Sequence, residues 1–259
     1  VTPNAQVSAN GSIVPVPLAF LPGTCPAPGT WCTAQTVTVA AVDDAVAEGP
    51  RGYTLTHAAT SVDGNYNGIA IVDVYPTVGD NDKFTFRTAA AHNGDFDNDP
   101  VLNGNADGSG VAEADAFCMA DANRPNGSTY KALLVNPTVA PTRIGSVTAD
   151  AGDGQVDWVL APNTNYFRRD GTTPLFTTNA NSIFVFGAMT NSFEASAGNT
   201  WSALRDDWRT LAGLNCTGWA TTAGTAGVGD ALATDGTALE LGGPPTNCSA
   251  TARLICVEQ

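Results

Sequence analysis

Basic residues are scarce in this sequence. Eleven Lys and Arg residues, of which only Lys83 and Lys131 are lysines, stand against 25 Asp and Glu, so the formal net charge is −14. Such an excess of negative charge repels nucleic acids and anionic lipid surfaces, and it favours solubility and divalent cations. We therefore expect no nucleic-acid partner.

Long hydrophobic runs are also missing. No stretch approaches the ~20 apolar residues of a membrane-spanning helix, and no signal peptide is visible, so we expect no membrane span. Hydrophobic residues still make up 43% of the 259 positions, which is enough for one large domain or two ordinary ones. The chain begins with Val rather than Met, which we interpret as a processed or excised piece of a secreted protein.

The motifs of common enzymes are absent. The only two histidines are His57 and His92, and the sequence has no Gly-x-Ser-x-Gly motif, phosphate loop or dinucleotide fingerprint. The carboxylate pair Asp206 and Asp207 does not indicate a glycosidase, because such pairs are common in so acidic a chain. We expect no enzymatic activity.

The cysteines are even in number and widely spaced. None forms a Cys-x-x-Cys pair, and the two histidines are too few for an ordinary zinc site. We therefore predict three disulfides in an oxidising compartment, outside the cell or at its surface, although buried free thiols in a cytosolic protein are the alternative. The six positions are Cys25, Cys32, Cys118, Cys216, Cys248 and Cys256.

Turn-forming residues dominate the local pattern. The 27 glycines and 16 prolines separate short runs rich in Val, Ile, Thr and Phe, which is typical of short strands joined by tight turns. One helix is predicted over residues 110–123, where Val111, Ala114, Cys118 and Ala122 share one face. The predicted strands span residues 12–20, 34–42, 52–60, 70–78, 82–90, 130–135, 155–161, 182–189 and 252–258.

The pattern changes near Asp82. Residues 1–82 have an all-β pattern, whereas residues 83–259 mix the helix with strands. The predicted fold class is therefore mainly β with an α+β second domain.

The first domain resembles the later strands of a Calx-β-like module, an immunoglobulin-like β-sandwich found in tandem in large bacterial surface proteins. Three landmarks between residues 13 and 82 carry this resemblance: "VDDAVAEG", "TSVDGNYNGI" and "DND". The segment "TCPAPGTWC" is an insertion, in which we expect a small loop closed by Cys25 and Cys32. The first strands of the module are missing.

Missing strands leave backbone N–H and C=O groups unpaired at the edge of a sandwich, where they recruit another strand. Either the chain was cut from a longer array, or a neighbouring chain completes the edge. We hypothesise that residues 1–12 or a partner's segment takes this place.

Acidic residues suggest Ca²⁺, which takes six to eight oxygen ligands. Five of them could converge at one end of the first domain, as in Calx-β relatives, or could be solvated turn residues: Asp43, Asp44, Glu48, Asp80 and Asp82. In "DFDND", the side chains of Asp95, Asp97 and Asp99 mimic the start of an EF-hand loop. Pro100 and Ala106 replace the glycine and the closing glutamate of that motif, so any calcium loop there is incomplete.

The second domain resembles a C-type-lectin-like domain of the endostatin-related bacterial type. The landmarks "ADAFCMADANRPNGSTYKALLV", "TWSAL", "LNCTGW" and "NCSATARLICVEQ" occur in the family's order across residues 83–259. By spacing alone, the four cysteines allow three pairings. The resemblance implies that Cys118 pairs with Cys256 and that Cys216 pairs with Cys248. It also places Trp201 and Leu204 in a core strand, and with them Trp208, although their spacing alone would favour a helix.

The calcium and sugar motifs of C-type lectins are absent, since "GGPPTN" precedes Cys248 where a sugar-binding relative has Trp-Asn-Asp. Residues 217–247 instead form a long Gly/Ala/Thr-rich loop. This loop either faces a ligand or is a surface loop with no ligand. If it faces a ligand, the candidate residues are Trp219, Asp230, Asp235 and Glu240.

Together these patterns predict an extracellular or cell-surface binding and adhesion protein with a protein or glycan partner and, at most, Ca²⁺ as a cofactor. The alternative is a structural subunit of an extracellular fibre or surface layer, assembled by strand complementation.

Overall fold

The computed structural model describes residues 2–22, 30–102 and 106–259. The chain divides into two compact units. Unit 1 comprises Val1–Asp44 and Pro50–Asp80, and unit 2 comprises Ala45–Gly49 and Asn81–Gln259. The short segment Ala45–Gly49 interrupts the continuous division predicted from the sequence, because the buried Ala47 donates its N–H to the carbonyl of Gly171.

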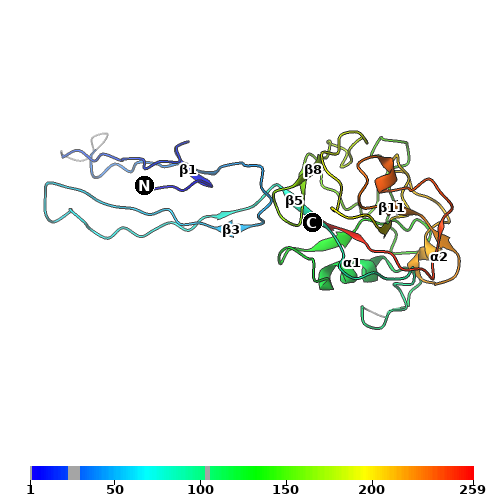
Figure 1. Cartoon of the computed structure of the whole chain (residues 1–259). Helices are drawn as coiled ribbons and strands as arrows, with labels where there is room; N and C mark the ends of the chain where they lie inside the picture. Colours follow the sequence, from blue (N-terminus) through cyan, green and yellow to red (C-terminus); the bar gives the residue numbers. More distant parts are fainter. Residues whose placement is uncertain (1, 23–29, 103–105) are drawn as a thin grey trace. The chain divides into compact units, whose positions relative to one another are not determined.

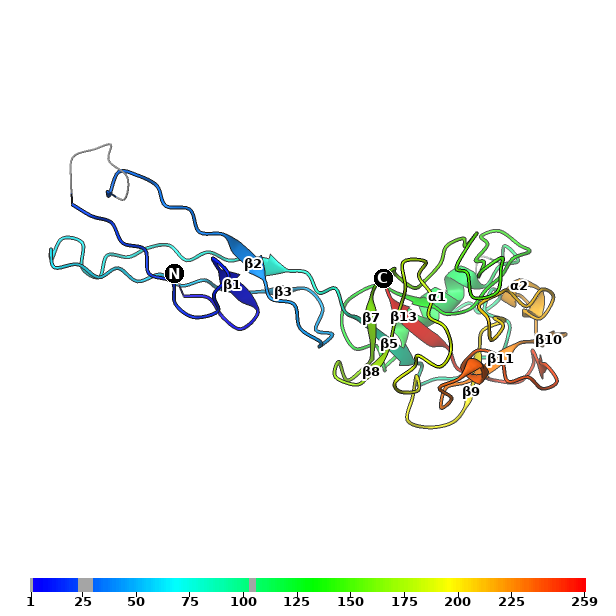
Figure 2. The same ribbon diagram turned by 90° about the horizontal axis from the view of Figure 1, so that it is seen from above.

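Unit 1 contains little regular pairing. Its strands form two antiparallel pairs, β1 (Val7–Ala9) with β2 (Val39–Ala41) and β3 (Arg51–Gly52) with β4 (Thr77–Val78). Between β3 and β4 the chain runs out and back in a long extended excursion, drawn in cyan in Figures 1 and 2. The predicted strand at residues 12–20 is irregular.

The N-terminal residues join both parts of unit 1. Strand β1 pairs with β2, and Thr2 forms an isolated bridge with Thr56 in the excursion. Leu55 and Val74 bridge the two sides of that excursion. Residues 2–9 thus pair with both parts of unit 1, whereas completion of a sandwich edge by the N-terminal segment stays a prediction.

Unit 2 is built on a five-stranded sheet with the order β6-β13-β5-β7-β8. Strands β5 and β7 are parallel, and the other neighbours are antiparallel. The bounds are β5 (Lys83–Arg87), β6 (Tyr130–Ala132), β7 (Asn165–Arg168), β8 (Pro174–Thr177) and β13 (Ile255–Glu258). Strand β13 therefore brings the last residues of unit 2 beside its first.

The sheet packs against helix α1 (Val111–Ala120), as Figure 1 shows. Val111, Ala114 and Cys118 are buried, as the spacing predicted. The helix ends at Asp121, whose backbone is extended, and the predicted fourth member of the stripe, Ala122, is exposed.

The remaining elements are short and lie toward the other end of unit 2. They are β9 (Asn199–Trp201), α2 (Cys216–Trp219), β10 (Thr225–Ala226), β11 (Val228–Asp230), the 3₁₀ turn η1 (Gly236–Ala238) and β12 (Thr246–Asn247). Strand β9 pairs with β11, and β10 pairs with β12. Trp201, Leu204 and Trp208 are fully buried and non-helical, so the placement in the core is confirmed and the helical alternative is wrong.

In unit 2, two predicted strands do not form, at residues 155–161 and 182–189. Phe184 is nevertheless buried, and its carbonyl accepts a hydrogen bond of 2.5 Å from the indole Nε1 of Trp208. These apolar runs therefore fill the core as irregular chain. The structure as a whole is mainly β with few helices.

Candidate functional site

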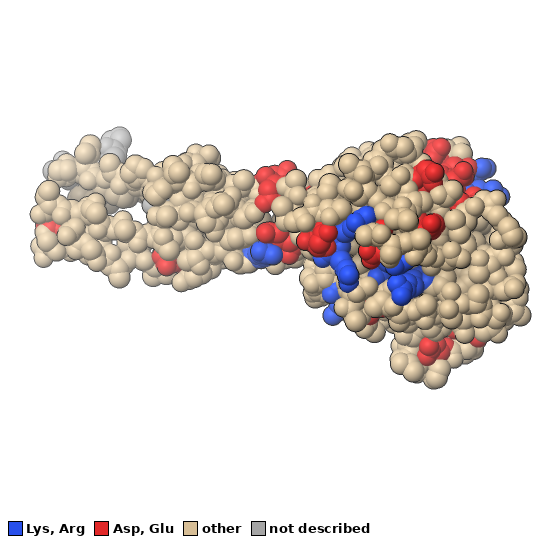
Figure 3. Space-filling view, in the orientation of Figure 1, with Lys and Arg blue, Asp and Glu red and all other residues tan. Residues whose placement is uncertain are grey.

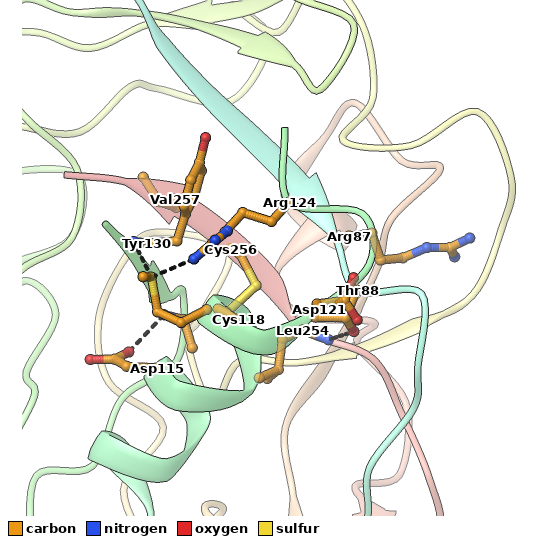
Figure 4. The surroundings of a disulfide bond; sticks show 12 residues. Arg87, Thr88, Asp115, Cys118, Asp121, Arg124, Tyr130, Leu254, Cys256 and Val257 are labelled. Carbon is orange, nitrogen blue, oxygen red and sulfur yellow. Dashed lines mark hydrogen bonds between the residues drawn. A yellow bond between two sulfur atoms is a disulfide. The ribbon is translucent and has the colours of Figure 1, made fainter. Parts of the chain in front are cut away.

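Two disulfides brace unit 2. Cys118 on α1 is bonded to Cys256 on β13, as Figure 4 shows, and Cys216 is bonded to Cys248. In both pairs the Cα atoms are 5.7 Å apart. These are the two pairs that the family resemblance implied. The expected partner of Cys32, Cys25, lies outside the described residues.

The loop from residue 217 to 247 is largely folded into unit 2 rather than free to face a ligand. Trp219 has no exposed surface, and its indole N–H donates to the carbonyl of Val135 at 2.9 Å. The four residues of α2 have positive φ angles of 50°, 52°, 84° and 66°. This left-handed turn directs Trp219 into the core, so the prediction of a ligand-facing Trp219 is wrong.

The three acidic candidates in the loop have local structural contacts. Asp230 accepts hydrogen bonds of 3.0 Å from the backbone N–H groups of Gly198 and Leu232. Asp235 caps η1 by accepting from the N–H of Thr237 at 3.0 Å. Glu240 accepts from the N–H of Asp206 at 3.3 Å. Their carboxylates stabilise turns and are not brought together around a common point.

The aspartates of "DFDND" diverge in the same way. Asp97 is buried and accepts from the N–H of Gly108 at 3.1 Å, while Asp95 accepts from the side-chain amide of Asn98 at 2.7 Å. Asp99 lies 2.9 Å from Nε2 of His92. This contact is the main cause that lowers the pKa of Asp99 below its ordinary value.

His92 is held on three sides. Its Nδ1 lies 2.8 Å from the carbonyl of Asn93, and its ring stacks on Phe96 with centroids 4.3 Å apart. Because both ring nitrogens face an oxygen, both donate when the ring is protonated. His92 thereby ties the "DFDND" segment to the core beside α1.

The five acidic residues predicted to converge near the end of the first domain are divided between the two units. In unit 1, Asp44 accepts a hydrogen bond from the side-chain amide of Gln6. In unit 2, the buried Asp82 accepts from Asn165 at 2.8 Å. Over the described ranges, no group of three or more His, Cys, Asp or Glu residues could hold a metal ion. A calcium site therefore stays a prediction from the sequence.

The buried guanidinium of Arg143 could not be predicted from the sequence. Arg143 has no exposed surface and forms bidentate hydrogen bonds with Asp115 at 2.9 and 2.8 Å. It also donates to Asp157 at 3.0 and 2.6 Å, and to the carbonyl of Ala132 at 2.8 Å. The partners come from α1, β6 and an irregular segment, so spacing in the chain does not reveal them.

Unit 1 has the opposite character to this braced core, since its apolar side chains are mostly exposed. Among its described residues, the only buried hydrophobic side chains are Val7, Ala9 and Leu55. Its large hydrophobic residues with high exposure are Ile13, Val14, Phe20, Leu21, Trp31, Val39, Val62, Tyr66, Ile69, Ile71, Val72, Val74 and Tyr75. We call these thirteen residues the apolar strand surface.

The apolar strand surface is concentrated in the excursion between β3 and β4. Adjacent side chains along its extended return segment are both exposed, since Ile71 and Val72 are 45% and 86% exposed. A strand that is apolar on both faces is typical of one that is covered on both faces. The apolar strand surface is thus the best candidate for an interface in unit 1.

A comparison with protein-family models gives a match that lies in unit 2. A model described as a protein of unknown function (DUF1554) matches residues 100–234, which is more than half of the 259 residues. The chain belongs to this family. The DUF1554 match lies entirely within unit 2, where it includes α1 and Cys216 and ends before Cys248 and Cys256. It leaves unit 1 uncovered.

No curated protein matches the chain. The two disulfides indicate an oxidising environment. Of the helices that the structure describes, none combines the length and the apolar character needed to cross a membrane.

Proposed function

We propose that this chain is a structural subunit of an extracellular fibre or surface layer and that copies assemble through the apolar strand surface of unit 1. The observation that carries this proposal is the imbalance between thirteen exposed large hydrophobic residues and three buried ones among the described residues of unit 1. Soluble monomers rarely expose a continuous apolar surface of more than a few hundred Å². A neighbouring subunit that supplies strands would cover it.

The free energy available from this surface is large. Complete burial of a large apolar side chain contributes roughly 1.5–3 kcal/mol, and about half of that is still available for a half-exposed one. Thirteen such residues would contribute on the order of 10 kcal/mol or more, before the entropic cost of association of roughly 4–15 kcal/mol. Assembly of many copies is therefore within reach of this surface alone.

Charge does little to oppose such contacts. Unit 1 has six charged residues, namely Asp43, Asp44, Arg51, Asp63, Asp73 and Asp80. On the face drawn in Figure 3, red and blue side chains are correspondingly sparse over unit 1 and frequent over unit 2. Natural edge strands are often protected from pairing by lysines, and unit 1 has none.

The resemblance of this segment to a Calx-β-like module without its first strands supports the same proposal. A sandwich that lacks strands can be completed by strands from another chain, with backbone hydrogen bonds supplying affinity and side-chain pockets supplying specificity. In this proposal unit 2 is the disulfide-braced domain that the assembly carries.

The experiment compares the full chain with two variants by size-exclusion chromatography with light scattering and by negative-stain electron microscopy. Val72→Asp places a charge in the apolar strand surface, and Val147→Asp places one at a comparably exposed valine of unit 2. We expect polymers of the wild type and of Val147→Asp, and smaller species for Val72→Asp. A wild type that stays monomeric at every accessible concentration would refute the proposal.

A binding or adhesion function of unit 2, which its resemblance to C-type-lectin-like domains implies, is the second candidate. It is favoured by a small charged cavity in unit 2.

A further inference from the structure

This cavity lies beside the central strand of the five-stranded sheet and has a volume of about 240 Å³. Its lining includes Phe193, which is only 2% exposed. Arg168 and Arg169, at the end of β7, and Glu194 contribute charged groups to its lining. The cavity therefore combines an apolar base with charges of both signs.

The two guanidinium groups retain unused donors. Nε and Nη2 of Arg168 donate to the backbone carbonyl and the hydroxyl of Ser192 at 2.8 and 2.9 Å. Arg169 donates through Nη1 to the side chain of Asn123. In the described part of the chain, neither arginine forms an ion pair. Each guanidinium has five N–H donors, so both can still bind a carboxylate.

The acidic groups of the lining differ from each other. Asp170 is occupied by its own turn, because it accepts from the N–H groups of Thr172 and Thr173 at 2.9 and 2.7 Å. Glu194 accepts one internal hydrogen bond, from the N–H of Ala195 to Oε1 at 2.8 Å. Its Oε2 accepts none among the described residues. Oε2 of Glu194 can therefore accept a hydrogen bond from a ligand.

The segment that carries Glu194 is anchored at both ends. Arg168 holds Ser192, and the buried Arg87 donates to the carbonyls of Ser196 and Ala197 at 3.2 Å. The charge of Arg87 also interacts with Glu194 at longer range. Anchoring reduces the conformational entropy lost when a ligand binds. The charged groups are thus placed before any ligand arrives.

We propose that this cavity binds a small zwitterion, namely a free α-amino acid with an apolar side chain. The ligand carboxylate would be held by Arg168 and Arg169, its ammonium group by Glu194, and its side chain against Phe193. A volume of about 240 Å³ is below the range of roughly 300–1,000 Å³ for drug-sized ligands and suits a molecule of amino-acid size. The balanced charge of the lining disfavours a dianion such as phosphate. This proposal concerns unit 2 and does not depend on assembly through unit 1.

The test measures binding of three related probes to the full chain by isothermal titration calorimetry. L-leucine carries both charges, N-acetyl-L-leucine lacks the ammonium group, and L-leucinamide lacks the carboxylate. We expect saturable binding of L-leucine and binding about tenfold or more weaker for each of the other two probes, as expected for the loss of one charge-assisted hydrogen bond. Absence of saturable L-leucine binding, or equal binding of all three probes, would overturn the proposal.

Two variants assign the roles within the cavity. Arg169→Gln should weaken L-leucine and N-acetyl-L-leucine alike, whereas Glu194→Gln should weaken L-leucine and leave N-acetyl-L-leucine unchanged or slightly tighter. Arg205→Gln, at an exposed arginine outside the cavity, is the matched control and should leave every affinity unchanged. Loss of folding cannot produce this opposite dependence on the probe. If Glu194→Gln affects both probes equally, the proposed role of Glu194 is wrong.

Discussion

Replacement of Arg143 by Met should strongly destabilise unit 2. The substitution retains much of the buried aliphatic volume but removes every hydrogen bond to Asp115, Asp157 and the carbonyl of Ala132. Breaking a buried ion pair by removing one partner typically costs about 3–5 kcal/mol. Because the side chains of Asp115 and Asp157 are 20% and 35% exposed and can regain some water, we expect about 3 kcal/mol.

The assay is thermal unfolding followed by circular dichroism. For a domain of 150–250 residues, 1 kcal/mol corresponds to roughly 2–4 °C, so Arg143→Met should lower the midpoint by about 6–12 °C. Arg209→Met is the control, because Arg209 is 45% exposed and pairs with Asp207 at the surface. Because exposed ion pairs contribute little to stability, the control should shift the midpoint by no more than about 4 °C. Equal shifts for the two variants would mean that the buried network of Arg143 contributes no more to stability than a surface pair.

The same network has a pH signature. Burial acts to raise the pKa of Asp157, but hydrogen bonds from Lys131 and Arg143 outweigh it, and the pKa lies below its ordinary value. A depressed pKa in the folded state means that this stabilisation is present above the unfolded pKa, near 3.9, and is lost as the pH falls through the folded pKa. The difference in stability between wild type and Arg143→Met should therefore become smaller below about pH 4.

Three further predictions concern unit 2. Removal of the disulfide between Cys118 and Cys256, which spans 138 residues, should lower the free energy of unfolding by about 5 kcal/mol. Removal of the disulfide between Cys216 and Cys248, which spans 32 residues, should lower it by about 4 kcal/mol. Guanidinium unfolding measures both values, and the reverse order would contradict the loop-entropy argument. Trp219→Ala should cost roughly 3–5 kcal/mol, while Val147→Ala, at a 66% exposed site of unit 2, should cost little; equal effects would mean that Trp219 is not in the core. Asp99→Asn should flatten the fall in stability below about pH 4, because the contact with His92 lowers the pKa of Asp99; an unchanged pH profile would exclude that contact.

Much of the core of unit 2 could be predicted because its signals are local or are carried by the family resemblance. The spacing of Val111, Ala114 and Cys118 predicted the buried face of α1. The order of the cysteines, together with the resemblance, indicated the bonds of Cys118 to Cys256 and of Cys216 to Cys248.

Strands of unit 2 that were not predicted, such as β7, lack an alternation of polar and apolar residues. In β7, the adjacent Tyr166 and Phe167 are both buried, so polar and apolar residues do not alternate. Residues 182–189 had a better pattern but form irregular chain, because aromatic packing around Phe184 and Trp208 replaces strand pairing. Tertiary packing therefore overrode the local strand preference of residues 182–189.

The candidate site residues were harder to predict, because acidic residues in turns have the same sequence pattern as acidic ligands. Asp235 caps a turn, whereas Glu194, which the sequence did not single out, lines a cavity. Trp219 was misplaced because the left-handed turn of α2 depends on its surroundings. A Cβ atom at Gly94 would lie 2.2 Å from Sγ of Cys216. The need for glycine at this position therefore arises from a residue distant in the sequence.

The most direct test of assembly through unit 1 is hydrogen–deuterium exchange of the full chain, measured by mass spectrometry over a wide range of protein concentrations. Amides of the excursion between β3 and β4, around Val72, should become protected as the concentration rises. Amides in the core of unit 2, such as those of β13, should exchange at the same slow rate throughout. Rapid exchange around Val72 at every concentration would contradict the account.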